Sequence, residues 1–339
     1  MSLGRIMSSK VYDFDQVIDR KNTHSFKWDN VTYPPNLDML PMPVADMDFV
    51  VADEILAAID KITFHGILGY SIVPDSLKLL AQQKIERDYS WSTSIDTQVW
   101  IPGIVPGITA ACAALTNENE GIITAVPVYH PFHLVAGWVN CPLITFKMIK
   151  EGNRWTFDFA DFERGLQKGP NVFLLCNPHN PGGTVFSTDE IARIKTLCQQ
   201  YDCKIISDEI HADLIIDSNI KHRCIQSEIS FFATSKAYNT AGLGGAVAII
   251  PDAATRLAFQ KKTFGFFPML SRHSIEVMLA TYAMPSNWMD ALILYLRSNH
   301  SLLLSRMNQL PGISMLPLEA TYLAWIGFDS QMHGDLQKR

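Results

Sequence analysis

A lysine and an aspartate, each placed directly after an apolar segment, are the residues of this chain best suited to chemistry. Lys236 lies in the segment Phe-Phe-Ala-Thr-Ser-Lys-Ala-Tyr-Asn-Thr-Ala-Gly-Leu (231–243) and follows the apolar run Ile229–Ala233. Asp208 follows a second apolar run, Lys204–Ser207. A lysine amine can form a Schiff base with an aldehyde, and a carboxylate can keep a pyridine nitrogen protonated; pyridoxal phosphate chemistry needs both groups. Taken alone, each residue is more commonly an exposed lysine or a strand-end cap, so the interpretation depends on the residues around them.

A glycine-led segment follows an earlier apolar run. Gly103-Ile104-Val105 leads into a helical pattern at Ile108–Leu115. The N–H groups and the positive dipole end at the start of a helix can hold a phosphate. An ordinary tight turn is the alternative interpretation of the same residues.

Three further side chains follow other apolar runs. Tyr129 could stack its ring on a flat cofactor, although a half-buried loop tyrosine is the commoner case. Asn180 lies in a turn with two Asn-Pro pairs and a Gly-Gly, and its amide can donate to a phenolic oxygen. His211 could contact the other side of a cofactor ring or cap a chain end.

The elements that must position these residues are short, continuously apolar runs that alternate with helical patterns. Such runs are typical of strands covered on both faces, and the alternation predicts an α/β fold with a mainly parallel, doubly wound sheet flanked by helices. Between the third and fourth runs, Ser187 and Glu190 form a capping-box pair that predicts a helix start. Ligands bind beyond the carboxyl ends of strands in such sheets. The predicted strands are Val99–Ile101, Ile122–Val126, Val172–Leu175, Lys204–Ser207, Ile229–Ala233 and Ala246–Ile250.

The C-terminal part of the sequence predicts a second, smaller α/β domain to which both termini contribute. Residues 288–308 are expected to form one long amphipathic helix that Pro311-Gly312 ends. Strands are expected at Ile313–Leu316 and Tyr322–Phe328. The predicted organisation is a leader at 1–10, an N-terminal segment that joins the small domain at 11–45, a large cofactor-binding domain at 46–287, and a small C-terminal domain at 288–339.

Composition excludes several classes of protein. The 339 residues are 47% apolar and 18% charged, an ordinary globular balance. A net charge of −6 argues against a nucleic-acid or anionic-membrane surface. No apolar segment reaches the roughly 20 residues that cross a bilayer, and the start has no apolar signal core. The six cysteines show no Cys-x-x-Cys spacing, which indicates reduced thiols in a cytoplasmic protein.

Patterns for other cofactors are absent from the sequence. Gly242-Leu-Gly244-Gly245 precedes a strand and has Val247 where the dinucleotide fingerprint needs glycine, and no phosphate loop of the Gly-x-x-x-x-Gly-Lys type occurs. His130 and His133 lie in a proline-flanked loop, where we expect no metal.

Taken together, the motifs resemble the class I/II aminotransferase superfamily of pyridoxal phosphate enzymes, fold type I. That resemblance is carried by Asn180-Pro181-x-Gly183, by Asp208-Glu209-Ile210-His211, and by Ser235-Lys236 followed by Asn239-x-Ala-Gly-Leu243. Other segments are similar to its MalY/PatB-type cystathionine β-lyase, or C–S lyase, branch: Phe14–Arg20, Lys27–Asp29, Val44–Phe49, His65–Tyr70 and Asp208–Asp213. The similarity covers nearly the whole chain.

The resemblance implies roles for the matching positions. Lys236 would carry the cofactor and, once substrate displaces it, remove the α-proton. Asp208 would pair with the pyridine nitrogen and Asn180 with the ring oxygen. Tyr129 would stack on the ring and His211 would lie beside it. The phosphate would be held by the N–H groups of Ile104 and Val105, by the Ser235 hydroxyl and by Tyr70 of a neighbouring subunit. The substrate would contact Ala45, Tyr129 and Asn180. The role of Tyr70 makes a homodimer an expectation.

Two departures from the family pattern stand out. Gly244 occupies a position where the superfamily often has a phosphate-contacting arginine. Relatives also continue beyond the Tyr322–Phe328 strand and supply there an arginine that grips the substrate carboxylate. The sequence stops at Arg339, whose context does not match that motif, so the small domain is expected to be incomplete relative to the family.

The function that the resemblance implies is α,β-elimination of cystathionine or another cysteine S-conjugate to a thiol, pyruvate and ammonia. Two alternatives stay open. One is an aminotransferase of amino acids on the same scaffold, and the other is a catalytically silent regulatory protein that acts through partner contacts.

Overall fold

The computed structural model describes residues 12–30 and 40–329. The leader expected at 1–10 and Arg339 lie outside the described residues. None of the described helices is long and apolar enough to cross a bilayer.

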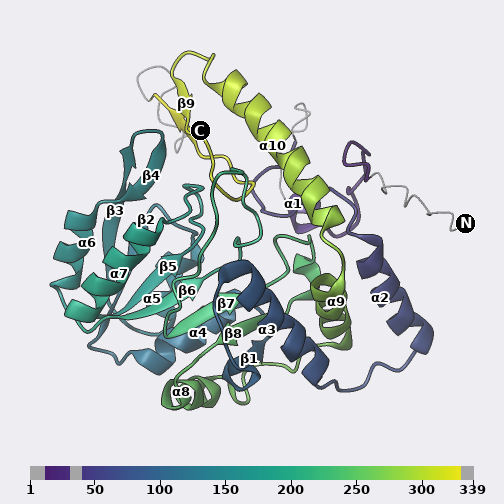
Figure 1. The fold of residues 1–339 in the computed structure, drawn as a ribbon, viewed down its shortest axis with the longest axis horizontal. Helices are drawn as coiled ribbons and strands as arrows, with labels where there is room; N and C mark the ends of the chain where they lie inside the picture. The colour runs from purple at the N-terminus through teal and green to yellow at the C-terminus, as the bar shows by residue number, and fades with distance from the viewer. Residues whose placement is uncertain (1–11, 31–39, 330–339) are drawn as a thin grey trace, which may run out of the picture.

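An eight-stranded sheet forms the centre of the molecule (Figure 1), in the order β1-β8-β7-β6-β5-β2-β3-β4. Five parallel strands run from β7 to β3, which agrees with the mainly parallel sheet predicted from the sequence. Strand β8 is antiparallel to both of its neighbours, and β4 is antiparallel to β3. The strands are β1 (Gln98–Ile101), β2 (Gly121–Val126), β3 (Leu143–Glu151), β4 (Arg154–Phe157), β5 (Pro170–Cys176), β6 (Lys204–Asp208), β7 (Ile229–Phe232) and β8 (Ala246–Ile249).

The hairpin β3–β4 was not among the predicted strands. Its outer part alternates between buried and exposed side chains, with Phe146 and Met148 buried and Lys147 exposed. That pattern suits an edge of the sheet rather than its buried centre, which explains why a search for continuous apolar runs passed over it.

Helices cover both faces of the sheet. On one face lie α4 (Ile104–Leu115), α5 (Pro131–Trp138) and α8 (Ala253–Thr263), whose apolar side chains share a core with alternate residues of the central strands. On the other face α6 (Phe159–Leu166) and α7 (Thr188–Gln200) pack with the intervening strand residues. The capping box of Ser187 and Glu190 at the start of α7 is confirmed.

The β1 end of the sheet is flanked by α3 (Asp75–Tyr89) and α9 (Arg272–Ala283), and α2 (Asp53–His65) packs on α9. Short 3₁₀ turns occur at Ile95–Thr97 and Ala241–Leu243. In α4, Gly107 packs so closely on the sheet that a Cβ there would lie 2.8 Å from the ring of Phe231. Glycine thus lets α4 approach β7.

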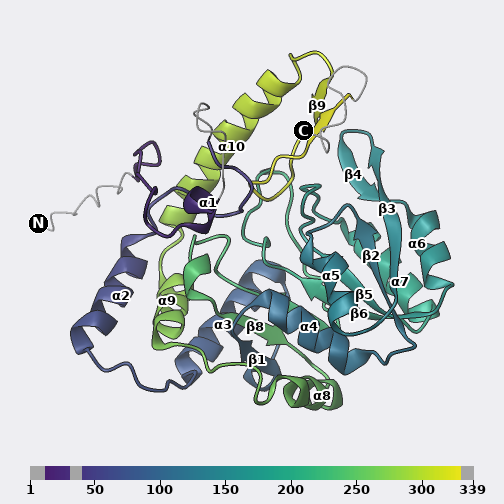
Figure 2. The same cartoon turned by 180° about the vertical axis from the view of Figure 1, so that it is seen from behind.

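A smaller unit lies on top of the sheet in Figure 1 and is seen from behind in Figure 2. It consists of α1 (Phe26–Asp29), α10 (Asn287–Met307), β9 (Ile313–Met315) and β10 (Ile326–Phe328). The long helix is within a residue of its prediction, while both strands are shorter than predicted. Phe14 from the N-terminal segment packs on Trp288 and Tyr295 of α10, so the expected contact between the two terminal segments is present. The domain boundaries remain predictions.

The loop after β9 connects this smaller unit to the sheet. The backbone N–H groups of Glu319 and Ala320 donate to the carbonyl of Gly183 at 3.0 and 2.9 Å. The Glu319 carboxylate accepts from Arg154 Nε at 2.8 Å, and Trp325 stacks on Trp155 with ring centroids 4.2 Å apart. The two parts are therefore joined by specific polar and aromatic contacts.

Candidate functional site

A cavity of about 110 Å³ lies beyond the carboxyl ends of the parallel strands, where the sheet topology predicts a ligand site. All of its lining residues except Cys176 and Ile210 were predicted from the sequence. The residues that line it are Ala45, Ile104, Val105, Tyr129, Cys176, Asn180, Asp208, Ile210, His211 and Lys236.

Lys236 follows β7 and is held by a backbone carbonyl from a distant part of the chain. Its Nζ donates to the Ala45 oxygen at 2.7 Å, and the Tyr322 hydroxyl donates to the same oxygen at 3.1 Å. Burial lowers the pKa of the Lys236 amine, and the nearby carboxylates of Asp46 and Asp208 oppose that shift. A lowered pKa increases the fraction of neutral amine, the form that acts as nucleophile or base.

Asp208 ends β6 and is 3% exposed. Its Oδ1 accepts a hydrogen bond from the backbone N–H of Ile210 at 3.0 Å. Burial raises the pKa of the carboxyl to about 7, with a smaller contribution in the same direction from Glu209; the Ile210 N–H and the Lys236 charge act against it. A cation placed beside this carboxyl would favour the ionised form. A protonated pyridine nitrogen is such a cation, so Asp208 fits the group implied by the sequence.

His211 and Tyr129 both line the cavity in their neutral forms. Burial, Lys236 and His179 lower the pKa of His211 to about 3. The His211 Nδ1 atom is buried and has no hydrogen-bond partner among the described residues. For Tyr129, burial and the charge of Asp208 raise the pKa, so the phenol stays protonated at neutral pH. An uncharged imidazole and a phenol ring suit the faces of a flat aromatic ligand.

The start of α4 supplies backbone donors to the same cavity. Gly103 is its N-cap and provides no side-chain cap. The first bond of the helix runs from the Gly107 N–H to the Gly103 carbonyl, so the N–H groups of Ile104 and Val105 precede it. Because this helix end carries a partial positive charge, it can bind a phosphate.

Two predicted residues lie outside the cavity lining. Ser235 precedes Lys236 and is partly buried, but its side chain is not part of the wall. Tyr70 is 97% exposed and borders a separate depression with Met269 and Arg272, so the role implied for it requires a second chain.

The departure at Gly244 has a structural reason. This residue has a φ of +67°, and a Cβ built on it would lie 2.8 Å from the carbonyl oxygen of Pro102. An arginine would therefore be strained and would clash with backbone in this conformation.

Sequence reasoning overlooked Cys176 and gave no role to Ile210 and Asn239, although both lie in the quoted motifs. Cys176 is the last residue of β5, and Ile210 contributes its backbone N–H to Asp208. Asn239 receives the Met47 N–H at 3.0 Å and donates to the carbonyls of Met47 and Phe49. Position at a strand end could have identified Cys176, whereas the Asn239 bonds join residues too far apart in sequence to leave a local signal.

Comparison with known proteins defines the class to which this fold and site belong. Residues 43–339 match the family model described as aminotransferase class I and II, and the chain belongs to this family. It is 30% identical to the cystathionine beta-lyase PatB of Bacillus subtilis over 96% of this chain and 88% of that protein. It is 28% identical to protein MalY of Escherichia coli over 93% and 84% of the two chains. Cystalysin from Treponema denticola, whose crystal structure contains pyridoxal 5′-phosphate, superposes with a TM-score of 0.89 at 28% identity, over 95% and 85% of the two chains.

Proposed function

We propose that this protein is a pyridoxal phosphate-dependent C–S lyase that eliminates a thiol from cystathionine or a related cysteine S-conjugate, leaving pyruvate and ammonia. The observation that carries the proposal is the presence of the Lys236 amine, with its lowered pKa, and the buried Asp208 carboxyl in one cavity. The similarity to PatB, a cystathionine beta-lyase, favours elimination as the reaction.

Residues already described would hold the cofactor. The N–H groups at the start of α4 would receive its phosphate, Asp208 its ring nitrogen and Asn180 its ring oxygen, while Tyr129 and His211 would lie against the ring. When bound, pyridoxal phosphate supplies an aldehyde for covalent attachment and a ring that accepts electrons.

The protein's own part in the reaction is proton transfer and orientation. The neutral Lys236 amine would remove the proton from the substrate α-carbon, because a buried amine with a lowered pKa is a base near neutral pH. The Ala45 carbonyl orients this amine through the bond from Nζ. Asp208, ionised by its cationic partner, would keep the ring nitrogen protonated.

We further propose a homodimer in which Tyr70 completes the site of the neighbouring subunit. Two segments beside Tyr70 expose large apolar side chains, a feature of interaction surfaces. The exposed side chains are Phe64, Ile67, Leu68 and Ile72 in the first segment, and Phe264, Phe266 and Met269 in the second. Covering them against a second copy of the chain would remove this apolar area from water.

The test is to supply cystathionine and pyridoxal phosphate without a keto-acid acceptor. Release of pyruvate and thiol over many turnovers supports the lyase. A reaction that stops after about one equivalent per site indicates an aminotransferase, and cofactor binding without any product indicates the silent regulatory protein.

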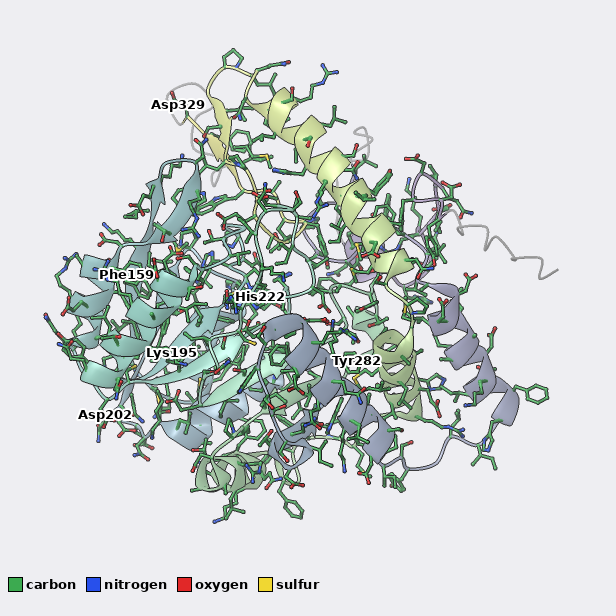
Figure 3. All side chains as sticks on the ribbon, in the orientation of Figure 1. Phe159, Lys195, Asp202, His222, Tyr282 and Asp329 are labelled. Atoms are coloured by element: carbon green, nitrogen blue, oxygen red, sulfur yellow. The ribbon has the colours of Figure 1, made fainter. Side chains whose placement is uncertain are left out.

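Lys236→Ala should abolish turnover and the covalent cofactor adduct that borohydride traps. Lys195→Ala is the matched control because Lys195, labelled in Figure 3, is an exposed lysine of α7. Trapping at another lysine in the wild-type protein would reject the assignment of Lys236.

A further inference from the structure

Four charged residues near the N-terminus form a compact cluster, called here the clamp: Arg20, Lys27, Asp46 and Asp48. Arg20 Nη1 and Nη2 each lie 3.1 Å from an oxygen of Asp46, and Nη1 lies 2.6 Å from Asp48 Oδ1. Lys27 Nζ lies 2.6 Å from Asp48 Oδ2 and 3.1 Å from Asp46 Oδ1. Two cations and two carboxylates thus balance one another.

The clamp is more than an exposed pair of ions. Lys27 is 4% exposed, and its Nζ also donates to the Asp46 carbonyl at 3.0 Å. Trp28 Nε1 donates to Asp48 Oδ1 at 2.9 Å. Burial raises the pKa values of Asp46 and Asp48, but the hydrogen bonds from the clamp and Trp28 outweigh it and lower both. Both carboxyls therefore stay ionised near neutral pH, and a network of this kind is held more rigidly than an isolated surface pair.

The clamp fixes the segment that faces Lys236. Asp46 and Asp48 belong to residues 45–49, and Asn239 binds the backbone of the same segment at Met47 and Phe49. The segment is thereby held from two sides. Its first residue, Ala45, presents the carbonyl that receives the Lys236 amine at 2.7 Å.

We propose that the clamp positions Lys236. By fixing residues 45–49, it holds the Ala45 carbonyl within hydrogen-bond distance of the amine, and this bond determines the position of the amine between proton transfers. The inference rests on the proposed function, in which Lys236 is the reacting base. None of the four clamp residues lines the cavity, so they act on the site through Ala45.

Charge balance in the clamp matters for the same amine. The Asp46 carboxylate favours the protonated form of Lys236, and Asp208 acts in the same direction from the cavity. Within the clamp, Arg20 and Lys27 bind Asp46 directly and offset its field. Loss of Asp48 would leave one excess positive charge and would loosen the Ala45 carbonyl, and both changes disfavour the protonated amine.

The test uses Asp48→Asn in the full chain, because Asp48 contacts the clamp and Trp28 rather than the cavity. Competitive acetylation of the cofactor-free protein, followed by peptide mass analysis across a pH series, measures the titration midpoint of Lys236 itself. We expect that midpoint to decrease by about half a pH unit or more. In the loaded enzyme we expect kcat to decrease about tenfold, with a smaller change in KM, because the base is misplaced while the cofactor contacts remain.

Lys78→Met is the control, since it removes an ion pair with Asp75 on α3 that touches neither the clamp nor the cavity. Trp28→Phe is the milder second variant in case Asp48→Asn folds poorly; it removes one bond to Asp48 and should shift the midpoint in the same direction.

The proposal would be overturned if Asp48→Asn destabilises the protein but leaves the titration midpoint of Lys236 and kcat equal to wild type. The clamp would then have a structural role only. A shift of the same size in Lys78→Met would overturn the proposal as well. If the wild-type protein releases no product, the proposed lyase fails, and the acetylation midpoint still decides whether the clamp controls Lys236.

Discussion

Asp208 and Glu209 are consecutive buried carboxylates that occupy different environments. Asp208 lines the cavity and accepts from the Ile210 N–H. Glu209 accepts from the Ser207 hydroxyl and from His222 Nε2, both at 2.6 Å, and His222, labelled near the centre of the view in Figure 3, is buried. One carboxylate is thus satisfied inside the protein, while the other borders the cavity and is available for a cationic ligand.

Asp208→Asn should weaken the binding of pyridoxal phosphate. Removing one partner of a buried, hydrogen-bonded charge pair costs about 2 kcal/mol or more, which corresponds to a roughly 30-fold higher Kd. An absorbance titration of the cofactor-free protein measures it. Asp202→Asn, at an exposed turn residue, is the control and should bind as wild type. An unchanged Kd in Asp208→Asn would show that Asp208 does not bind the cofactor.

The same substitution should stabilise the cofactor-free protein at high pH. The pKa of Asp208 is about 7 in the fold, against an ordinary value of 3.8. Between pH 3.8 and about 7, the folded protein binds more protons than the unfolded chain. The contribution of the Asp208 carboxyl to the free energy of unfolding therefore decreases as pH rises, and it is constant above the folded pKa. We expect Asp208→Asn to exceed wild type by about 2–4 kcal/mol at pH 8.

That advantage should disappear near pH 4, where the carboxyl is neutral in most folded and about half of unfolded molecules. Urea unfolding across the pH series measures the difference. A stability difference between Asp208→Asn and wild type that does not vary with pH would contradict the raised pKa.

Gly107→Ala should destabilise the protein by about 1–3 kcal/mol although alanine favours helices, because the added methyl meets Ile101 and Phe231. Gly137→Ala is the matched control in α5, since no atom lies within 4 Å of the Cβ that it adds. That control should be neutral or more stable by up to about 1 kcal/mol. Thermal and urea unfolding report both variants, and equal behaviour would show that α4 is not closely packed at Gly107.

Glu319→Gln should destabilise the contact between the smaller unit and the sheet by about 1–3 kcal/mol. Its carboxylate accepts from Arg154 Nε at 2.8 Å and from the Val185 N–H at 2.7 Å, in a partly buried setting. Arg164→Gln removes an exposed pair with Asp161 and should cost less than about 0.5 kcal/mol. Equilibrium unfolding by urea measures the free energy of unfolding of both variants. If Glu319→Gln loses no more stability than Arg164→Gln, Glu319 does not couple the smaller unit to the sheet.

Mixing two inactive variants tests the proposed dimer. Tyr70→Ala and Lys236→Ala should each be inactive alone. After the two variants are unfolded and refolded together in equal amounts, about half of the dimers should contain one chain of each variant. Each mixed dimer has one site with both native residues and one site with neither, so about a quarter of the wild-type activity should be recovered. Sedimentation or gel filtration checks that the mixture is dimeric. No recovery from a confirmed mixed dimer would place Tyr70 outside the neighbouring site.

Sequence patterns predicted the central sheet and most of the cavity wall because both depend on local rules. Continuous apolar runs identified the buried strands, and polar residues after the second to fifth runs identified positions at the carboxyl edge. The edge hairpin β3–β4 escaped because its alternating pattern carries less apolar signal. The bonds of Asn239 and Tyr322 escaped because each depends on how two distant segments pack. Local sequence carries no record of such packing.

The carbonyl of Ala45 joins parts of the chain that are made at very different times. Its two donors, Lys236 and Tyr322, follow it by 191 and 277 positions. A growing polypeptide can therefore form the strands of the central sheet well before the Ala45 carbonyl has both of its hydrogen-bond donors. On the ribosome, the Ala45 carbonyl can acquire its second hydrogen-bond donor only after Tyr322 has emerged.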